Sequence, residues 1–169
     1  MSFNVDLKRG QCWEDELFNY ASANLSLPVV KSEVSQQLKH GGDFMITTEE
    51  GVFHVECKHD YAAKRTGNLY LEVEVSYPDK PLIQGWVYKL PTNCLVVWKV
   101  DEGEYYAMNE LEVLEAAVAN YKRASFTSKI PNSKGVLLPK STLTKLNSLD
   151  EILGVIKDEI ECMNMLLWG

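Results

Sequence analysis

The stretch GGDFMITTEEGVFHVECKHD, residues 41–60, decides the fold because it reads as two alternating strands joined by a turn. The turn is expected near residues 48–51, and the numbers of facing residues then add up to roughly 99. Asp43 is thereby predicted to lie across from Glu56. Side chains alternate along a strand, so Glu56 and Lys58 share one face.

Two facing carboxylates repel each other, and one of them takes up a proton unless a cation lies between them. A hard divalent ion such as Mg²⁺ relieves this repulsion, needs only one or two carboxylates and keeps several waters. Lys58 is two residues after Glu56, where an ammonium group can orient a water or steady charge on a phosphate oxygen. The pattern therefore predicts chemistry suited to phosphodiester hydrolysis.

The rest of the chain predicts an α/β fold in a single domain covering residues 1–169. The expected elements besides the hairpin are a helix at about 9–25, a half-buried strand at 67–77, a fully buried strand at 94–100, a short strand near 104–109, a helix capped by Asn109, a strand at 133–140 and a last helix at about 141–168. This order indicates a mixed β-sheet flanked by helices.

Composition bounds the function. With 46% hydrophobic and 24% charged residues, the 169-residue chain is typical of a soluble globular protein with a core. No apolar run suits a membrane span or a secretory signal, so we expect an intracellular, cytoplasmic protein without a membrane partner. Four scattered cysteines indicate reduced thiols. The net charge of −7 argues against general nucleic-acid coating but leaves a local basic surface open.

Asp43, followed by Glu56-Cys57-Lys58, resembles the D…(D/E)xK motif of the PD-(D/E)XK nuclease superfamily. Many members carry a further acidic residue before the core hairpin, and Glu14 on the first predicted helix resembles it. The order helix, three strands, helix, strand also resembles the common core of that superfamily. One departure is the position before the first Asp, where glycine stands instead of the family's proline.

The resemblance covers about residues 9–140 and implies a restriction-endonuclease-like core to which the last helix, at about 141–168, has been added. It implies an Mg²⁺-dependent deoxyribonuclease of the restriction, resolvase or homing type, in a phage or prokaryotic setting, with Mn²⁺ as a substitute ion.

The same resemblance implies a role for each residue of the motif. Asp43, Glu56 and the carbonyl of Cys57 are expected to bind the metal. Lys58 is expected to position or activate the attacking water, and Glu14 to help place metal or water.

The loop after the hairpin is basic and contains glycine. Lys64, Arg65, Thr66 and Asn68 are expected to contact the phosphate backbone of DNA with their side chains and amides. Because a duplex has two strands to cut, we also expect a homodimer or a higher homo-oligomer.

Simpler readings stand beside these. Asp43 can cap a turn, Glu56 and Lys58 can form a solvated strand face, and Glu14 can complement a helix dipole. The alternative functions are a non-catalytic, nuclease-like domain that binds nucleic acid, and a protein-interaction or inhibitor domain.

Overall fold

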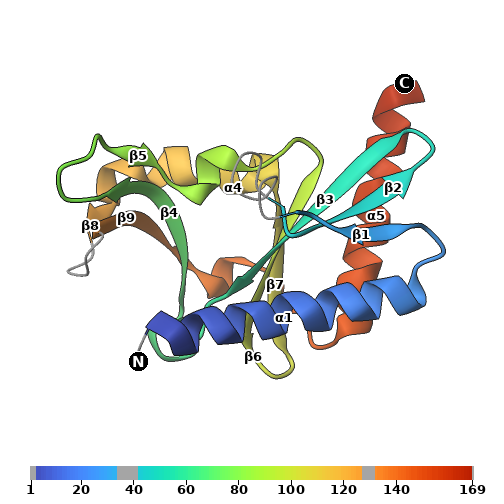
Figure 1. Cartoon of the computed structure of the whole chain (residues 1–169), viewed down its shortest axis with the longest axis horizontal. Helices are drawn as coiled ribbons and strands as arrows, with labels where there is room; N and C mark the ends of the chain where they lie inside the picture. Colours follow the sequence, from blue (N-terminus) through green and yellow to red (C-terminus); the bar gives the residue numbers. More distant parts are fainter. Residues whose placement is uncertain (1–2, 34–41, 127–131, 169) are drawn as a thin grey trace.

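The computed structural model describes residues 3–33, 42–126 and 132–168 and contains two sheets and several helices (Figure 1). In chain order the elements are α1 (Phe3–Asn24), β1 (Val29–Lys31), β2 (Phe44–Thr48), β3 (Gly51–His59), α3 (Ala63–Thr66), β4 (Asn68–Ser76), β5 (Ile83–Gln84), η1 (Trp86–Lys89), β6 (Cys94–Asp101), β7 (Glu104–Asn109), α4 (Glu110–Asn120), η2 (Tyr121–Arg123), β8 (Ser125–Phe126), β9 (Asn132–Pro139), η3 (Lys140–Thr142) and α5 (Leu149–Trp168).

The first sheet contains the hairpin and has the strand order β1-β2-β3-β6-β7. β3 runs parallel to β6, while the other neighbours are antiparallel, which confirms the predicted mixed sheet. Parallel neighbours require a long crossover connection, and here the crossover carries α3, β4, β5 and η1. From Cys94 to Val100, β6 is buried along its whole length, as its continuous apolar run predicted.

A second, antiparallel sheet of order β5-β4-β9-β8 was not anticipated from the sequence. Its strand β4 has the predicted alternation, with Leu69, Leu71 and Val73 buried. These side chains pack against one face of the first sheet and against α4. The predicted N-cap of α4 is confirmed, because Asn109 and Glu112 form a reciprocal capping box.

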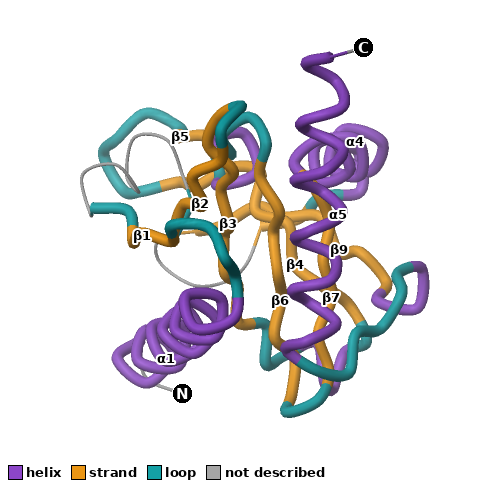
Figure 2. Tube along the Cα trace, turned by 90° about the vertical axis from the view of Figure 1, so that its right-hand side faces the viewer, coloured by secondary structure: helices purple, strands orange, loops and turns teal. Residues whose placement is uncertain are grey.

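The other face of the first sheet is covered by α1 and α5, which run in different directions across it (Figures 1 and 2). Trp13 and Leu17 of α1, together with Ile152 and Ile156 of α5, are essentially inaccessible to solvent. Both helices therefore bury an apolar stripe against the sheet that contains the hairpin strands.

The first helix is longer than predicted, since it begins at Phe3 rather than near residue 9. Gly10 lies inside the helix, where a glycine costs only about 1 kcal/mol relative to alanine. A side chain at Gly10 would meet no atom within 4 Å, so nothing about local packing requires a glycine there.

The last helix begins at Leu149, not near residue 141 as predicted. The predicted start coincides instead with the short 3-10 helix η3, after which Leu146 exchanges two backbone hydrogen bonds of 2.8 and 2.9 Å with Tyr105 of β7. The hydroxyl of Ser148 then accepts a hydrogen bond from the N–H of Glu151 at the helix start. Because α5 completes the first core, it is an integral part of the packing. No helix in the described ranges is long and apolar enough to cross a membrane.

Candidate active site

The hairpin register is the one the sequence predicted. Partners in β2 and β3, from Phe44 with Val55 to Thr48 with Gly51, have numbers that add up to 99 in every case. Just beyond the ladder, the N–H of Asp43 donates a 2.8 Å hydrogen bond to the carbonyl of Val55. This bond continues the pairing by one position and brings Asp43 beside Glu56.

Backbone amides hold both carboxylates across the hairpin. Oδ2 of Asp43 accepts the N–H of Cys57 at 2.6 Å. Oε2 of Glu56 accepts the N–H of Gly42 at 2.7 Å. Each acidic side chain is therefore fixed by the opposite strand, and charged acceptors make such bonds short and strong.

Gly42 stands where the motif that the sequence resembles has proline, and its backbone conformation excludes proline. Its φ of +84° lies in the left-handed region, which proline cannot adopt. Its N–H is also the group that binds Glu56, and proline has no N–H. The glycine thus supplies both the turn into β2 and one anchor of the site.

Lys58 completes the centre of the site. Its Nζ lies 3.0 Å from Oε1 of Glu56, and the side chains of the pair are only 27% and 12% exposed. The same ammonium lies 4.5 Å from the centre of the Trp86 ring in η1. A cation held between a carboxylate and an aromatic face keeps a defined position, which a solvated lysine would not.

Glu14 approaches from α1 and is paired with Lys31 of β1 at 3.8 Å. Burial raises the pKa of Glu14, Lys31 opposes this increase, and Asp15 and Glu56 add to it. The influence of Glu56 indicates that Glu14 lies within electrostatic reach of the hairpin site. The role predicted for Glu14 in placing metal or water stays a prediction.

Asp43 carries the clearest electrostatic signature. Burial, followed by the charges of Glu56 and Glu14, raises its pKa to about 8, although the Cys57 amide and Lys58 act in the opposite direction. The Cys57 amide and Lys58 both favour the ionised carboxylate, but they do not offset the increase in pKa that burial and the neighbouring carboxylates cause. The site has more carboxylates than its cations neutralise.

The donor set fits a hard, open metal site rather than a closed cage. In the described ranges, no three side chains of His, Cys, Asp or Glu are grouped closely enough to enclose an ion. Asp43 and Glu56 nevertheless offer oxygen ligands, and Mg²⁺ needs only one or two carboxylates because it retains waters. Burial raises the pKa of the Cys57 thiol well above its usual range, so only the Cys57 carbonyl remains a candidate ligand.

Glu56 and Lys58 open into a pocket of about 330 Å³ bordered by β3, β4 and η1. The other lining residues are Glu72, Val75, Tyr77, Ile83, Gln84, Trp86, Lys89 and Leu90. They come from β4, β5 and η1 and from the residues next to these elements. Trp86 in particular resembled an ordinary core aromatic in the sequence.

The residues predicted to contact DNA lie elsewhere. Lys64 and Arg65, with His59 and Tyr61, line a different pocket of about 720 Å³ beyond the end of β3. Lys64 is paired with Asp101 at 2.8 Å. Thr66 and Asn68 bond to each other's backbone at the start of β4. The structure therefore does not bring this loop into the pocket that contains Glu56 and Lys58.

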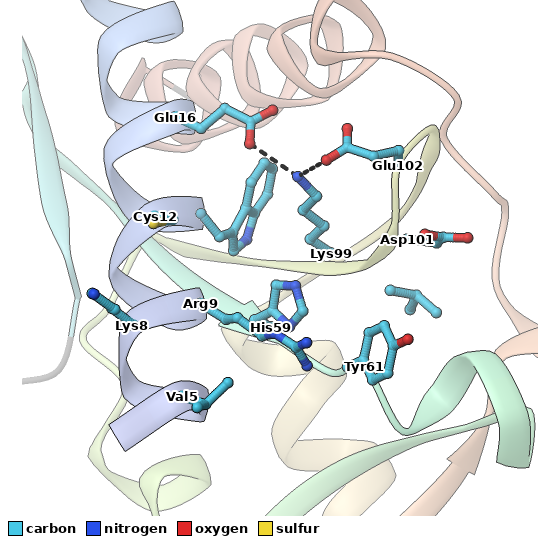
Figure 3. A pocket seen from close by; sticks show the side chains of 12 residues that line it. Val5, Lys8, Arg9, Cys12, Glu16, His59, Tyr61, Lys99, Asp101 and Glu102 are labelled. Atoms are coloured by element: carbon cyan, nitrogen blue, oxygen red, sulfur yellow. Dashed lines mark hydrogen bonds and ion pairs between the residues drawn. The ribbon is translucent and has the colours of Figure 1, made fainter. Parts of the chain in front are cut away.

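A third hollow adjoins that loop and is lined by α1, the end of β3 and the β6–β7 turn (Figure 3). The guanidinium of Arg9 lies 4.7 Å from the centre of the Tyr61 ring, and His59 stacks on the same ring. Lys99 bonds to Glu16 and Glu102 at 2.9 and 2.6 Å. The charges around Lys99 are thus largely balanced within the protein.

Comparisons with known proteins found a distant structural likeness. No protein-family model matches the chain, and no curated protein matches it. Among solved structures, the chain is similar to that of a bacterial homing endonuclease, I-Ssp6803I, with a TM-score of 0.46 and 14% sequence identity. The match covers 67% of this chain and 73% of that chain. A likeness this distant is no evidence of activity.

Proposed function

We propose that this protein is a metal-dependent DNA endonuclease that hydrolyses phosphodiester bonds and uses Mg²⁺, with Mn²⁺ as a substitute. The observation that carries the proposal is the crowding of Asp43 and Glu56, which are held side by side with Lys58 next to them. Excess negative charge in a half-buried place favours a dication, and an adjacent ammonium suits work on a phosphate.

Asp43, Glu56 and the carbonyl of Cys57 would hold the metal. Oδ1 of Asp43 makes no hydrogen bond within the described part of the chain, so it is available as a ligand. Once bound, the ion would polarise a phosphoryl oxygen and lower the pKa of a coordinated water.

Lys58 is proposed to hold the attacking water and to stabilise negative charge as it develops on the phosphate. The Trp86 ring limits where its ammonium can move. Glu14, partly buried and near the pair, is proposed to accept a hydrogen bond from a water on the α1 side.

A role for Lys64, Arg65, Thr66 and Asn68 in binding phosphates remains a proposal. The end of β3 lies three residues after Glu56, which corresponds to about 10 Å along a strand. A DNA strand a few nucleotides long covers that span, so the loop would contact phosphates beside the scissile one rather than the scissile one itself.

The test is incubation with supercoiled plasmid, branched DNA and RNA, with Mg²⁺ or with a chelator. We expect Mg²⁺-dependent DNA cleavage that Lys58→Ala abolishes while DNA binding persists. Lys89→Ala is the matched control, because Lys89 lines the same pocket but makes no ion pair with Glu56. It should keep cleavage.

Two results would support the alternative functions instead. DNA binding without cleavage under any metal would indicate a non-catalytic, nuclease-like domain. No DNA binding even at low salt would indicate a protein-interaction domain, because phosphate contacts strengthen steeply as salt falls.

A further inference from the structure

The hollow between α1, the end of β3 and the β6–β7 turn (Figure 3) has no role in the proposed cleavage. Its volume is about 610 Å³, which is within the range of small-molecule sites. Trp13 and Val100 line it and are 1% and 0% exposed, so its floor belongs to the packed core. An apolar hollow of this size with a few polar groups around it is typical of a ligand site.

Tyr61 gives this hollow an aromatic wall. The residue is 46% exposed, and the His59 ring stacks on it with 6.4 Å between the ring centres. The guanidinium of Arg9 lies over the same ring, 4.7 Å from its centre. These two contacts join α1 to the segment after β3 and limit the movement of the ring. Aromatic rings held in this way stack with the planar rings of nucleobases.

Arg9 gives the same hollow a group that suits phosphate. Its position over Tyr61 limits where the guanidinium can move. A guanidinium has five N–H donors, and its planar fork can donate two parallel hydrogen bonds to one phosphate. Lys8, next to it on α1, also lines the hollow and forms no ion pair within the described ranges. The α1 side of the hollow therefore carries two cations.

The carboxylates around this hollow each have a lysine partner. Glu16 and Glu102 are bound to Nζ of Lys99 at 2.9 and 2.6 Å. Asp101 is paired with Lys64 at 2.8 Å. Two lysines thus offset most of the negative charge of three carboxylates. Carboxylate oxygens at the rim can also accept hydrogen bonds from ribose hydroxyls or from the amino group of a base.

We propose that the hollow binds a nucleoside monophosphate, with the base beside Tyr61 on the apolar floor and the phosphate at Arg9 and Lys8. The base matches the apolar and aromatic surfaces, the phosphate matches the two cations, and the ribose matches the carboxylate rim. A free nucleotide and a nucleotide at the end of a DNA strand share this chemistry. The hollow shares no lining residue with the pocket of Glu56 and Lys58, so the proposal does not depend on the nuclease function.

The test is calorimetric titration of the whole chain with adenosine 5′-monophosphate in a chelator, so that no metal contributes. We expect saturable binding that Arg9→Gln weakens about tenfold to a hundredfold, because this change removes a charge-assisted contact with phosphate. Tyr61→Ala should also weaken binding, whereas Tyr61→Phe keeps the ring and should bind like wild type. Circular dichroism and thermal unfolding show that each variant is folded.

Arg123→Gln is the matched control, because Arg123 is an exposed arginine of η2 that does not line this hollow. It should bind the nucleotide like wild type.

Thiol labelling locates the bound nucleotide. Cys12 and Cys162 are both exposed free thiols; Cys12 lines this hollow, whereas Cys162 lies on α5. Bound nucleotide should slow the alkylation of Cys12 by iodoacetamide, measured by mass spectrometry, and leave that of Cys162 unchanged. Parallel titrations with adenosine 5′-monophosphate and with a 5′-phosphorylated single strand of DNA distinguish the two sources, because the natural ligand should protect Cys12 at the lower concentration.

Three results would overturn the proposal: no binding at millimolar nucleotide, wild-type affinity in Arg9→Gln, or equal protection of Cys12 and Cys162. Inorganic phosphate that binds as tightly as the nucleotide would also contradict it, since the ring would then contribute nothing. Nucleotide binding by a protein that cuts no DNA would refute the nuclease function and leave this site standing.

Discussion

Replacing Asp43 by asparagine should stabilise the metal-free protein and should abolish the proposed DNA cleavage. The folded protein raises the pKa of Asp43 from 3.8 to about 8 through burial and neighbouring carboxylates. At 1.36 kcal/mol per pH unit, this difference corresponds to an upper limit of about 6 kcal/mol of lost stability at alkaline pH. Relaxation around a half-buried group reduces that figure, so we expect Asp43→Asn to raise the free energy of unfolding by about 2–4 kcal/mol at pH 8.

The pH dependence gives the sign of the effect. Because the folded pKa lies above the unfolded one, the folded state keeps a proton that the unfolded chain releases between pH 4 and about 8. The contribution of Asp43 is therefore fully present below pH 4 and is lost as pH rises to about 8. Urea unfolding of wild type in a chelator should show this decline, and the Asp43→Asn variant should lack it.

Two controls make the prediction specific. Asp101→Asn changes a partly exposed carboxylate whose pKa is lowered by a hydrogen bond from Lys64, so this variant should gain no stability. Mg²⁺ should stabilise wild type by mass action but not Asp43→Asn. If Asp43→Asn is no more stable than wild type at pH 8, and wild type shows no decline with pH, then the crowding of charge inferred here is wrong.

Three further outcomes are expected. Trp86→Ala should slow cleavage about 5- to 30-fold in single-turnover assays, because it removes the cation–π interaction that positions the Lys58 ammonium, which is worth about 1–2 kcal/mol. Trp86→Phe keeps an aromatic face and should retain more activity. Asn109→Ala should lower stability by about 1 kcal/mol in urea unfolding, since it removes the cap of α4. Gly85→Ala should destabilise by about 2 kcal/mol or more in the same assay, because its Cβ would lie 2.2 Å from the backbone oxygen of Glu72; a neutral effect would show that this wall of the pocket can shift.

Local rules explain why the hairpin was predictable. Alternation fixes which face each strand residue occupies, and the turn fixes the register, so Asp43 and Glu56 were placed opposite each other without tertiary information. The same reasoning identified the burial of β6 and the Asn109 cap. These features depend on interactions between neighbours in the chain or across one tight turn.

What the sequence alone determined was therefore the pair of carboxylates, the lysine two residues further on and the mixed sheet that contains them. Only the tertiary structure decided that Trp86 from a distant segment lies against Lys58, that a second sheet forms the opposite wall, and that Lys64 and Arg65 border a separate pocket. The physical reason is the distance along the chain over which each effect acts. Periodicity and turn chemistry act over a few residues, whereas a pocket forms where elements far apart in the chain bury their apolar faces together.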